Sequence, residues 1–281
     1  MQKKKPKLGQ HFLFDEKTLN KIVDAAEVCR KDVVLEIGPG TGSLTQKLLM
    51  RARKVIAVEI DQNLVQKLRS KFRDYRDLKV IKQDIIEFAN HELEFKDYKV
   101  VGNIPYYISG KILRKFTSQT KNRPSFMVLL VQKEVGERIC AKSGKMSVLS
   151  VAIQVFGKPE IVCHVPRDKF DPQPEVDSVV LRIKYFKRSL LARNLGWFGR
   201  RGRPTISPLE MDEQEEEFFR LVKIGFSARR KQLHNNLKSG YRISKAEADA
   251  WLARADIKPK IRAQDLEVED WIRLLAMKFK F

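Results

Sequence analysis

The feature that most constrains the fold is a repeated alternation of short apolar runs with longer helical patterns between residues 32 and 184. Five runs rich in β-branched residues predict strands at 32–37, 54–59, 78–81, 98–101 and 126–131, with amphipathic stretches such as 64–72 and 108–116 between them. Strands that alternate with helices form a parallel, doubly wound α/β sheet. The uninterrupted apolar run 126–131 suits a strand that is buried on both faces. Two later strands, 161–165 and 176–183, are expected to close one sheet edge as a hairpin.

The rest of the chain has a different composition. Residues 185–209 contain no acid, and we interpret them as a basic linker that carries Lys187, Arg188, Arg193, Arg200, Arg201 and Arg203. Acidic residues then cluster at 210–217, as suits the first turns of a helix. The pattern stays helical to the end, and Ser244 followed by Glu247 fits a capping box. The sequence predicts a domain at 1–184, a linker at 185–209 and an all-helical domain of about three helices at 210–281.

The charge balance points to a polyanionic partner. Lys and Arg number 56 against 35 Asp and Glu, a formal net charge of +21. Such an excess suits contact with nucleic-acid phosphates, and RNA is the expected partner, although a merely solvated basic surface is the plain alternative. No apolar stretch reaches the roughly 20 residues of a membrane span, and no secretory signal is evident, so we expect a cytoplasmic protein without a membrane partner. The three cysteines and four histidines are scattered, which predicts no metal site.

A glycine loop at 38–42 (GPGTG) follows the first strand. Glycines at such a turn let the backbone approach a ligand closely. The spacing differs from the dinucleotide pattern and favours a ligand with an amino-acid tail, while an NAD site and a plain strand–helix turn are the alternatives. Glu36, at the strand end, is expected to help bind an ammonium group, directly or through water. Glu59 ends the second strand, where a carboxylate can accept both ribose hydroxyls.

Two further motifs follow the third and fourth strands. Asp84 is placed to accept a hydrogen bond from an adenine amine of a cofactor, or it is simply a turn residue. Residues 103–106 (NIPY) fit the chemistry of an exocyclic adenine amine, whose lone pair is delocalised into the ring. The Asn103 amide oxygen and the Ile104 carbonyl can accept its hydrogens, Pro105 stiffens the turn, and Tyr106 offers a stacking face.

These motifs, together with residues 9–13 (GQHFL) and 170–178 (FDPQPEVDS), closely resemble the ribosomal RNA adenine dimethyltransferase family, and most of all its housekeeping branch. The resemblance implies a Rossmann-like methyltransferase sheet, a monomer, and S-adenosylmethionine as cofactor. It implies dimethylation of the N6 amine of two adjacent adenosines near the 3′ end of small-subunit (16S) rRNA, in the assembling 30S subunit or the naked RNA. A base that undergoes chemistry must leave its stack or lie in an unpaired loop.

The resemblance also implies roles by position. Gln10, His11 and Leu13 would line the cofactor pocket, and Phe170 would stack on the target adenine opposite Tyr106. The S-adenosylmethionine site itself would be formed by Gly38, Gly40, Glu59, Asp84 and Asn103. Two features depart from the family's pattern, namely the long arginine-rich stretch at 189–207 and Tyr107, where bacterial members commonly have Asn.

RNA contacts are expected from two basic clusters, although a solvated face is an equal alternative for each: Lys3, Lys4 and Lys5 near the N-terminus, and Arg229, Arg230 and Lys231, which we expect to open a helix. Three functional alternatives stay open. They are a large-subunit rRNA methyltransferase of the antibiotic-resistance type, a non-catalytic RNA-binding assembly or transcription factor, and a DNA adenine methyltransferase.

Overall fold

The computed structural model describes residues 10–88, 95, 97–199 and 203–278, and its chain forms two compact units. The first comprises Met1–Glu137 and Lys158–Tyr185, and the second comprises Arg138–Gly157 and Phe186–Phe281. The division near residue 185 lies beside the predicted end of the first domain. The segment 138–157, however, groups with the C-terminal unit instead of the sheet, which no local sequence signal indicated.

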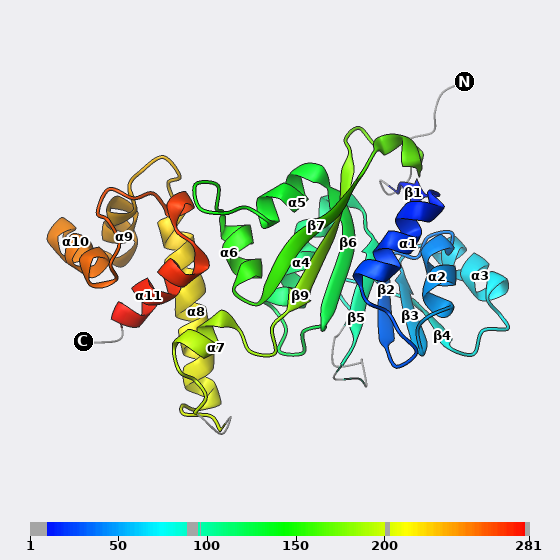
Figure 1. Cartoon of the computed structure of the whole chain (residues 1–281), viewed down its shortest axis with the longest axis horizontal. Coiled ribbons are helices and arrows are strands. Elements are labelled where there is room, and N and C mark those ends of the chain that lie inside the picture. The colour runs from blue at the N-terminus through cyan, green and yellow to red at the C-terminus, as the bar shows by residue number, and fades with distance from the viewer. Residues whose placement is uncertain (1–9, 89–94, 96, 200–202, 279–281) are drawn as a thin grey trace. The chain divides into compact units, whose positions relative to one another are not determined.

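A seven-stranded sheet forms the first unit, in the order β4-β3-β2-β5-β6-β9-β7 (Figure 1). The strands are β2 (Val33–Ile37), β3 (Lys54–Glu59), β4 (Leu78–Lys82), β5 (Lys99–Asn103), β6 (Phe126–Gln132), β7 (Gly157–Val165) and β9 (Ser178–Tyr185). Neighbours from β4 through β6 pair in parallel, whereas β9 runs antiparallel to β6. All five predicted parallel strands are therefore confirmed, as is the side-by-side placement of the two later strands at one edge.

Helices precede, connect and follow the parallel strands, as the alternating pattern predicts. They are α1 (Glu16–Ala25), α2 (Ser43–Leu49), α3 (Gln62–Lys71), α4 (Ser109–Thr117) and α5 (Lys133–Ile139). Apolar residues at helical spacing on α1, including Leu19, Ile22 and Val23, pack into one buried cluster with Leu48 of α2 and Val34 of β2. This burial removes apolar surface from water and fixes the helices against the sheet.

The chain order places a ligand crevice at β2. From β2 the chain continues to β3 and β4 on one side of β2, and it then crosses to β5 on the other side. In doubly wound sheets the crevice beyond the carboxyl ends of such strands is the usual binding place. The loops after β2, β3 and β5 carry the glycine loop, the residues after Glu59, and the tetrad that begins at Asn103.

A second, two-stranded ladder escaped the sequence analysis. β1 (Phe12–Leu13) pairs antiparallel with β8 (Phe170–Asp171), with Phe12 opposite Asp171 and Leu13 opposite Phe170. Each strand is only two residues long, which is too short for a periodic signal. The ladder joins the N-terminal segment, residues 10–14, to the loop that follows β7.

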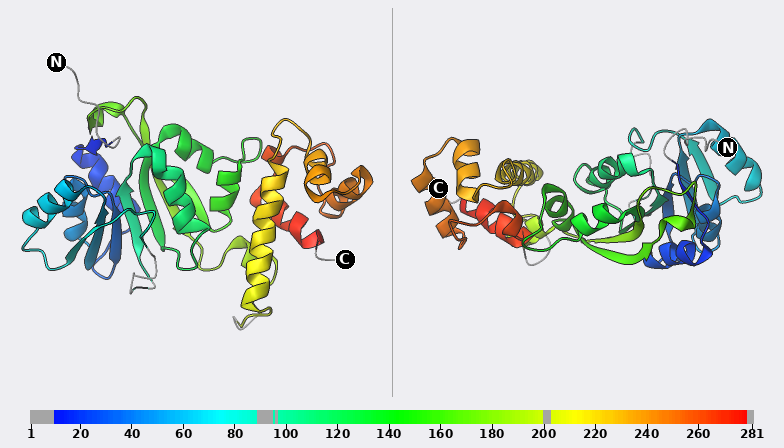
Figure 2. Two further views of the ribbon diagram at one scale, coloured as in Figure 1. Left: turned by 180° about the vertical axis from the view of Figure 1, so that it is seen from behind. Right: turned by 90° about the horizontal axis from the view of Figure 1, so that it is seen from above.

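The second unit is helical. Its helices are α6 (Val148–Gln154), α7 (Leu190–Asn194), α8 (Pro208–Gly225), α9 (Leu233–Tyr241), α10 (Lys245–Arg254) and α11 (Val268–Lys278), and Figure 2 shows them from two further sides. The region from residue 208 onward thus holds four α-helices instead of about three. Both α8 and α10 begin with capping boxes, formed by Ser207 with Glu210 and by Ser244 with Glu247. The predicted box at Ser244 is confirmed.

The stretch 185–209 is more ordered than the predicted linker. Leu191 of α7 is fully buried, and the indole of Trp197 is buried and donates a hydrogen bond from Nε1 to Gln214 of α8 at 2.7 Å. Phe198 forms an isolated bridge with Pro204. A few apolar residues among the arginines therefore fold this segment onto the helical unit. Among the described residues, no helix is both long and apolar enough to cross a bilayer.

Candidate active site

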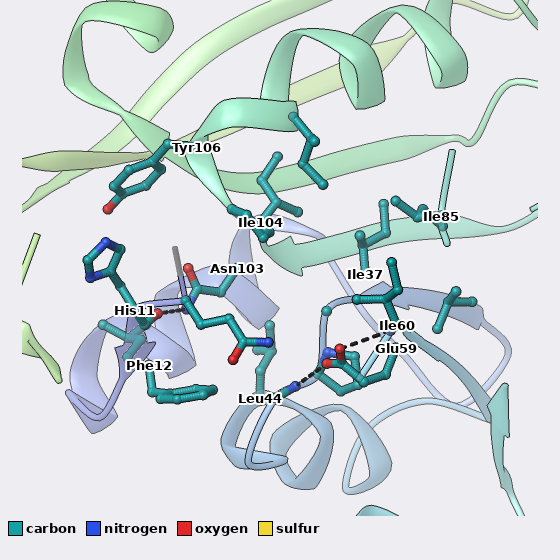
Figure 3. Close-up of a pocket in the computed structure, with 18 of the residues that line it drawn as sticks. His11, Phe12, Ile37, Leu44, Glu59, Ile60, Ile85, Asn103, Ile104 and Tyr106 are labelled. Carbon is teal, nitrogen blue, oxygen red and sulfur yellow. Dashed lines mark hydrogen bonds between the residues drawn. The ribbon is translucent and has the colours of Figure 1, made fainter. Parts of the chain in front are cut away.

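A cavity of about 290 Å³ opens at the carboxyl ends of β2, β3 and β5 (Figure 3). Most of the residues that the sequence singled out line it. They are Gln10, His11, Leu13, Gly38, Gly40, Glu59, Asp84, Asn103, Ile104, Pro105 and Tyr106. Motifs up to 96 residues apart in the chain thus meet in one cavity, which is what the predicted parallel sheet requires.

The glycine loop lines this cavity. Its backbone takes conformations that residues other than glycine rarely adopt. Gly38, Gly40 and Gly42 have φ values of +63°, +57° and +83°. A Cβ added to Gly40 would also lie 2.9 Å from the Phe12 ring of the N-terminal segment. Glycine is thus required at Gly40 by both backbone conformation and close approach. Phe12 was not predicted as a pocket residue, because a phenylalanine in the sequence can equally be a pocket wall or a core residue.

Glu59 is held as a preformed acceptor at the end of β3. It is 4% exposed; its Oε2 accepts from the Gly40 amide at 3.2 Å, and its Oε1 accepts from the amides of Ile60 and Asp61 at 2.9 and 3.0 Å. Burial raises the pKa of this carboxyl, while the three amide donors oppose the rise. The donors fix the side chain where it can accept hydrogen bonds from a ligand's hydroxyl groups.

Glu36 does not line the cavity, which goes against its predicted contact with an ammonium group. The side chain is fully buried, and neither carboxyl oxygen has a hydrogen-bond partner among the described residues. Burial raises the pKa of Glu36 to about 8; the neighbouring Thr45 hydroxyl opposes the rise and Glu59 adds to it. The strand's pleat points this residue away from the ligand side, into a place where the neutral acid is favoured.

Asn103 is oriented by the N-terminal segment. Its Nδ2 donates to the His11 carbonyl at 2.8 Å, the dashed line beside Asn103 in Figure 3. Only the amide nitrogen can face a carbonyl, so Oδ1 points the other way. Tyr106 is fixed as well, because its hydroxyl shares a 2.6 Å hydrogen bond with Ser178 Oγ. Burial raises the pKa of the Tyr106 phenol, which keeps it neutral.

Asp84 lies at the cavity wall after β4. Its Oδ1 accepts from the Ile86 amide at 2.8 Å, a turn contact of the kind that the plain interpretation predicted. Asp84 nevertheless lines the cavity together with Ile60 and Ile85, which supply an apolar surface beside the carboxylate. An apolar slot with one acceptor suits an adenine ring with an exocyclic amine.

Phe170 does not reach the cavity. It is 3% exposed and belongs to the buried cluster around α1 and the sheet, where its backbone pairs with Leu13. The ring that lies against Tyr106 is His11, with centroids 5.7 Å apart and planes inclined by 21°. The expected stacking of Phe170 opposite Tyr106 is therefore not the arrangement of this structure, because the β1–β8 ladder draws Phe170 into the core.

The two basic clusters have different outcomes. Lys3, Lys4 and Lys5 lie outside the described residues. Arg229, Arg230 and Lys231 are exposed and occupy the turn between α8 and α9, so they precede the helix instead of opening it. Within the described part of the chain, no group of three or more His, Cys, Asp or Glu is placed to bind a metal ion.

The order of the sheet, its antiparallel strand β9 and the crevice at β2 define a Rossmann-like methyltransferase with a helical C-terminal region. The chain belongs to the ribosomal RNA adenine dimethylase family, whose sequence model matches residues 1–199. The family and the fold class predicted from the sequence are thereby confirmed.

Three relatives give the extent of the similarity. The ribosomal RNA small subunit methyltransferase A of Dehalococcoides mccartyi (strain CBDB1) is 40% identical over 269 residues, covering 95% of this chain and 86% of that protein. A dimethyladenosine transferase from Plasmodium falciparum superposes with a TM-score of 0.77 at 28% identity, over 96% and 98% of the two chains. The 23S rRNA methyltransferase ErmE gives a TM-score of 0.72 at 25% identity, over 95% and 98%.

Proposed function

We propose that this protein uses S-adenosylmethionine to dimethylate the N6 amines of two adjacent adenosines near the 3′ end of small-subunit rRNA. The substrate would be the RNA or the assembling 30S subunit, and the enzyme would act as a cytoplasmic monomer. The observation that carries the proposal is the orientation of Asn103. Its amide nitrogen is held by the His11 carbonyl, so its oxygen is left as an acceptor beside Tyr106.

The residues of the cavity fit the proposed cofactor. Glu59 can accept hydrogen bonds from the ribose hydroxyls, and Asp84 with Ile85 suits the adenine. Gly38 and Gly40 carry no side chain, so their backbone can approach the amino-acid tail closely. When bound, S-adenosylmethionine supplies an electrophilic methyl group whose carrier leaves as a neutral thioether, so no acid is needed to assist departure.

The chain's own part in the reaction is alignment. Asn103 Oδ1 and the Ile104 carbonyl would accept the two hydrogens of the target amine and turn its lone pair toward the methyl group. Each transfer forms one N–C bond as the S–C bond breaks, and the amine releases one proton to water. A second transfer requires the same acceptors to hold a monomethylated amine, which retains one hydrogen. Catalysis by positioned acceptors needs no covalent enzyme intermediate.

The small-subunit substrate is favoured by the relative from Dehalococcoides mccartyi, which is 40% identical over nearly the whole chain. The large-subunit alternative has its own support, since the 23S rRNA methyltransferase ErmE shares the fold at a TM-score of 0.72. The exposed turn at 229–231 supplies three cations that suit RNA phosphates, and the same role is proposed for Lys3, Lys4 and Lys5.

A methyl-transfer assay tests the proposal. The protein is incubated with labelled S-adenosylmethionine and undermethylated small or large ribosomal subunits, and the digested RNA is analysed by mass. We expect dimethyladenosine in small-subunit RNA only, with the rate lowered at least ~100-fold in Asn103→Ala. The exposed Asn63, which does not line the cavity, gives a matched control, and Asn63→Ala should retain the wild-type rate.

Each other outcome selects an alternative. Label confined to large-subunit RNA would identify an enzyme of the resistance type. Label in DNA alone would identify a DNA adenine methyltransferase. If S-adenosylmethionine binds but no nucleic acid is labelled, the protein is a binding factor that has kept its pocket.

A further inference from the structure

The arginine-rich stretch that departs from the family's pattern has no role in the proposed chemistry. Its described parts, 186–199 and 203–207, belong to the helical unit, and we call them the arginine arm. Residues 185–209 contain no acid, whereas four described cations of the arm are exposed: Lys187, Arg188, Arg193 and Arg203. A run of positive charge without acids among it suits contact with a polyanion.

The arm is anchored by groups that leave its arginine side chains unused. Leu191 of α7 is fully buried, and Trp197 donates from Nε1 to Gln214 of α8 at 2.7 Å. Figure 1 shows α7 beside α8, as this bond requires. Beyond Trp197 the Gly199 amide donates to the Arg203 carbonyl at 2.9 Å. The backbone of Arg203 is therefore fixed on the helical unit, while its side chain is exposed.

Two arginines of the arm are held over aromatic rings. The guanidinium carbon of Arg188 lies 4.3 Å from the centroid of the Phe198 ring, and that of Arg193 lies 4.8 Å from the centroid of the Phe186 ring. A guanidinium over a ring keeps its charge and its N–H donors. Among the described residues, neither arginine donates a hydrogen bond or forms an ion pair. Both side chains thus offer oriented donors to an external acceptor.

Acidic residues follow the arm in the chain, on α8, but they are not paired with its cations. Glu210 Oε2 accepts from the Ser207 amide at 2.7 Å within the capping box, and Glu217 forms ion pairs with Arg220 and Lys278. No ion pair joins a described acid to a described cation of the arm. The arginines therefore stay available to an outside partner, and the longer-range repulsion between these acids and a polyanion is screened by salt.

We propose that the arginine arm binds the backbone phosphates of a double-stranded segment of the substrate RNA, through Arg188, Arg193 and Arg203. The inference rests on the proposed RNA substrate and adds a contact surface for it on the helical unit. A planar guanidinium with free N–H donors matches two phosphate oxygens at once. Three such groups on one anchored segment fit a regularly spaced backbone of phosphates.

The arm's aromatic residues favour a duplex over a single strand. Unpaired bases are bound by stacking on exposed aromatic faces, whereas duplex RNA is held through its backbone. Trp197 is buried, and the rings of Phe186 and Phe198 each have an arginine over them. The arm therefore presents guanidinium groups, and its rings serve to position them.

The test measures how the affinity for RNA depends on salt. The protein is titrated with a labelled RNA hairpin and with a labelled single strand of equal length, from about 50 to about 200 mM salt. Each lost phosphate contact lowers the slope of log affinity against log salt by about 0.9. We expect Arg188→Met, Arg193→Met and Arg203→Met each to lower the slope for the hairpin by about 1, and its affinity about 5- to 10-fold. The triple variant should lower the slope by about 2 to 3.

Three further variants separate charge, shape and position. Arg73, an exposed arginine of the first unit paired with Asp74 at 3.6 Å, is the matched control, and Arg73→Met should leave the slope unchanged. Arg188→Lys retains the charge but not the planar fork, so it should keep the slope and lose about threefold in affinity. Phe198→Leu should lower the affinity in the wild type but not in Arg188→Met, because the ring acts through Arg188.

Specific results would overturn the arm as a duplex-binding surface. An unchanged slope in the triple variant, with or without a lower unfolding free energy in urea, would show that the arginines are only structural. A larger loss on the single strand than on the hairpin would reject duplex binding. A loss confined to assembled subunits, absent with naked RNA, would assign the arm to a protein partner.

Methylation assays keep this inference separate from the proposed function. In the triple variant we expect a higher KM for undermethylated small subunits, with kcat and S-adenosylmethionine affinity unchanged, because the arm belongs to the helical unit and the cofactor cavity to the first. Failure of the wild-type enzyme to label any RNA would reject the proposed function. An active wild type with an equally active and equally tight-binding triple variant would reject the arm alone.

Discussion

One fully buried and one partly buried glutamate show how differently the two units surround a carboxyl group. Glu36, behind the glycine loop, is fully buried without a hydrogen-bond partner among the described residues, and its pKa rises to about 8. Glu217, on α8, accepts from the Tyr241 hydroxyl at 2.6 Å and from Lys278 Nζ at 2.5 Å. Burial opposes the ionised form of Glu217, yet the bonds from Lys278 and Tyr241 outweigh it and lower its pKa.

The contrast separates a region arranged for ligand binding from one arranged for stability. Buried polar groups without partners cost free energy, and they concentrate where function needs them. In the helical unit the buried Asn236 is paired, because its Nδ2 donates to the Gly225 and Ala228 carbonyls, whereas the Trp271 indole nitrogen has no hydrogen-bond partner among the described residues. We therefore expect removal of the Glu36 carboxyl to improve stability, and removal of the paired Glu217 carboxyl to reduce it.

Glu36→Gln gives the largest expected effect, and it depends on pH. The folded pKa of Glu36, about 8, lies above its usual 4.5, so ionisation favours the unfolded chain. The stability contributed by this carboxyl is fully present below pH 4.5 and is lost as pH rises toward 8, by about 1.4 kcal/mol per pH unit. The unfolding free energy of the wild type, measured in urea from pH 5 to 8, should fall relative to that of Glu36→Gln.

Glu217→Gln provides the mirror-image control. The pKa of Glu217 is lowered in the folded protein. Its carboxylate therefore stabilises the folded protein at pH values above its unfolded-state pKa, and this stabilisation is lost as the pH falls through the folded-state pKa. The difference in unfolding free energy between Glu217→Gln and the wild type should therefore shrink on acidification and stay constant from pH 6 to 8. Parallel pH profiles for wild type and Glu36→Gln would show that Glu36 is ionised in the folded protein, and the contrast between the regions would fail.

Gly225→Ala should strongly destabilise the helical unit. A Cβ there would lie 2.2 Å from Trp271, a fully buried ring that cannot move aside. Overpacking of this kind costs about 3 kcal/mol, measured as a lower unfolding free energy in urea. Gly110→Ala on α4 is the matched control, since no atom lies within 4 Å of the added Cβ, and it should be neutral or stabilising by about 0.5–1 kcal/mol. Equal losses in both variants would contradict the packing argument.

Glu59→Gln tests the ligand side of the contrast. The amide keeps the shape of the carboxylate but has only one acceptor oxygen for the Gly40 and Ile60 amides and for a ribose. We expect S-adenosylmethionine affinity, measured by calorimetry, to fall about 10- to 100-fold, the range for a lost hydrogen bond to a charged group. Asp61→Asn makes the same change two residues away, outside the cavity, and should leave the affinity unchanged. Unchanged affinity in Glu59→Gln would place the ribose elsewhere.

The sequence was informative wherever a feature depends on neighbouring residues. The parallel strands, the glycine loop, Asn103 and the box at Ser244 are all coded within a few positions. It failed where a contact joins distant segments. The His11–Pro172 hydrogen bond spans 161 positions, and the β1–β8 ladder that buries Phe170 spans a similar distance. Nothing local distinguishes the buried, unpaired Glu36 from a carboxylate that faces a ligand.

Ser244→Ala has the smallest expected effect and tests the locally coded side of this contrast. Ser244 Oγ accepts from the Glu247 amide at 3.1 Å, and Glu247 Oε2 accepts from the Ser244 amide at 2.7 Å. Loss of the Ser244 hydroxyl leaves an amide at the start of α10 unpaired, which costs about 1 kcal/mol of unfolding free energy. Ser244→Gly should cost only a few tenths of that, since glycine leaves the amide open to water. Equal stability of Ser244→Ala and wild type in urea would mean that packing of Trp251 and Leu252, and not the cap, decides where α10 begins.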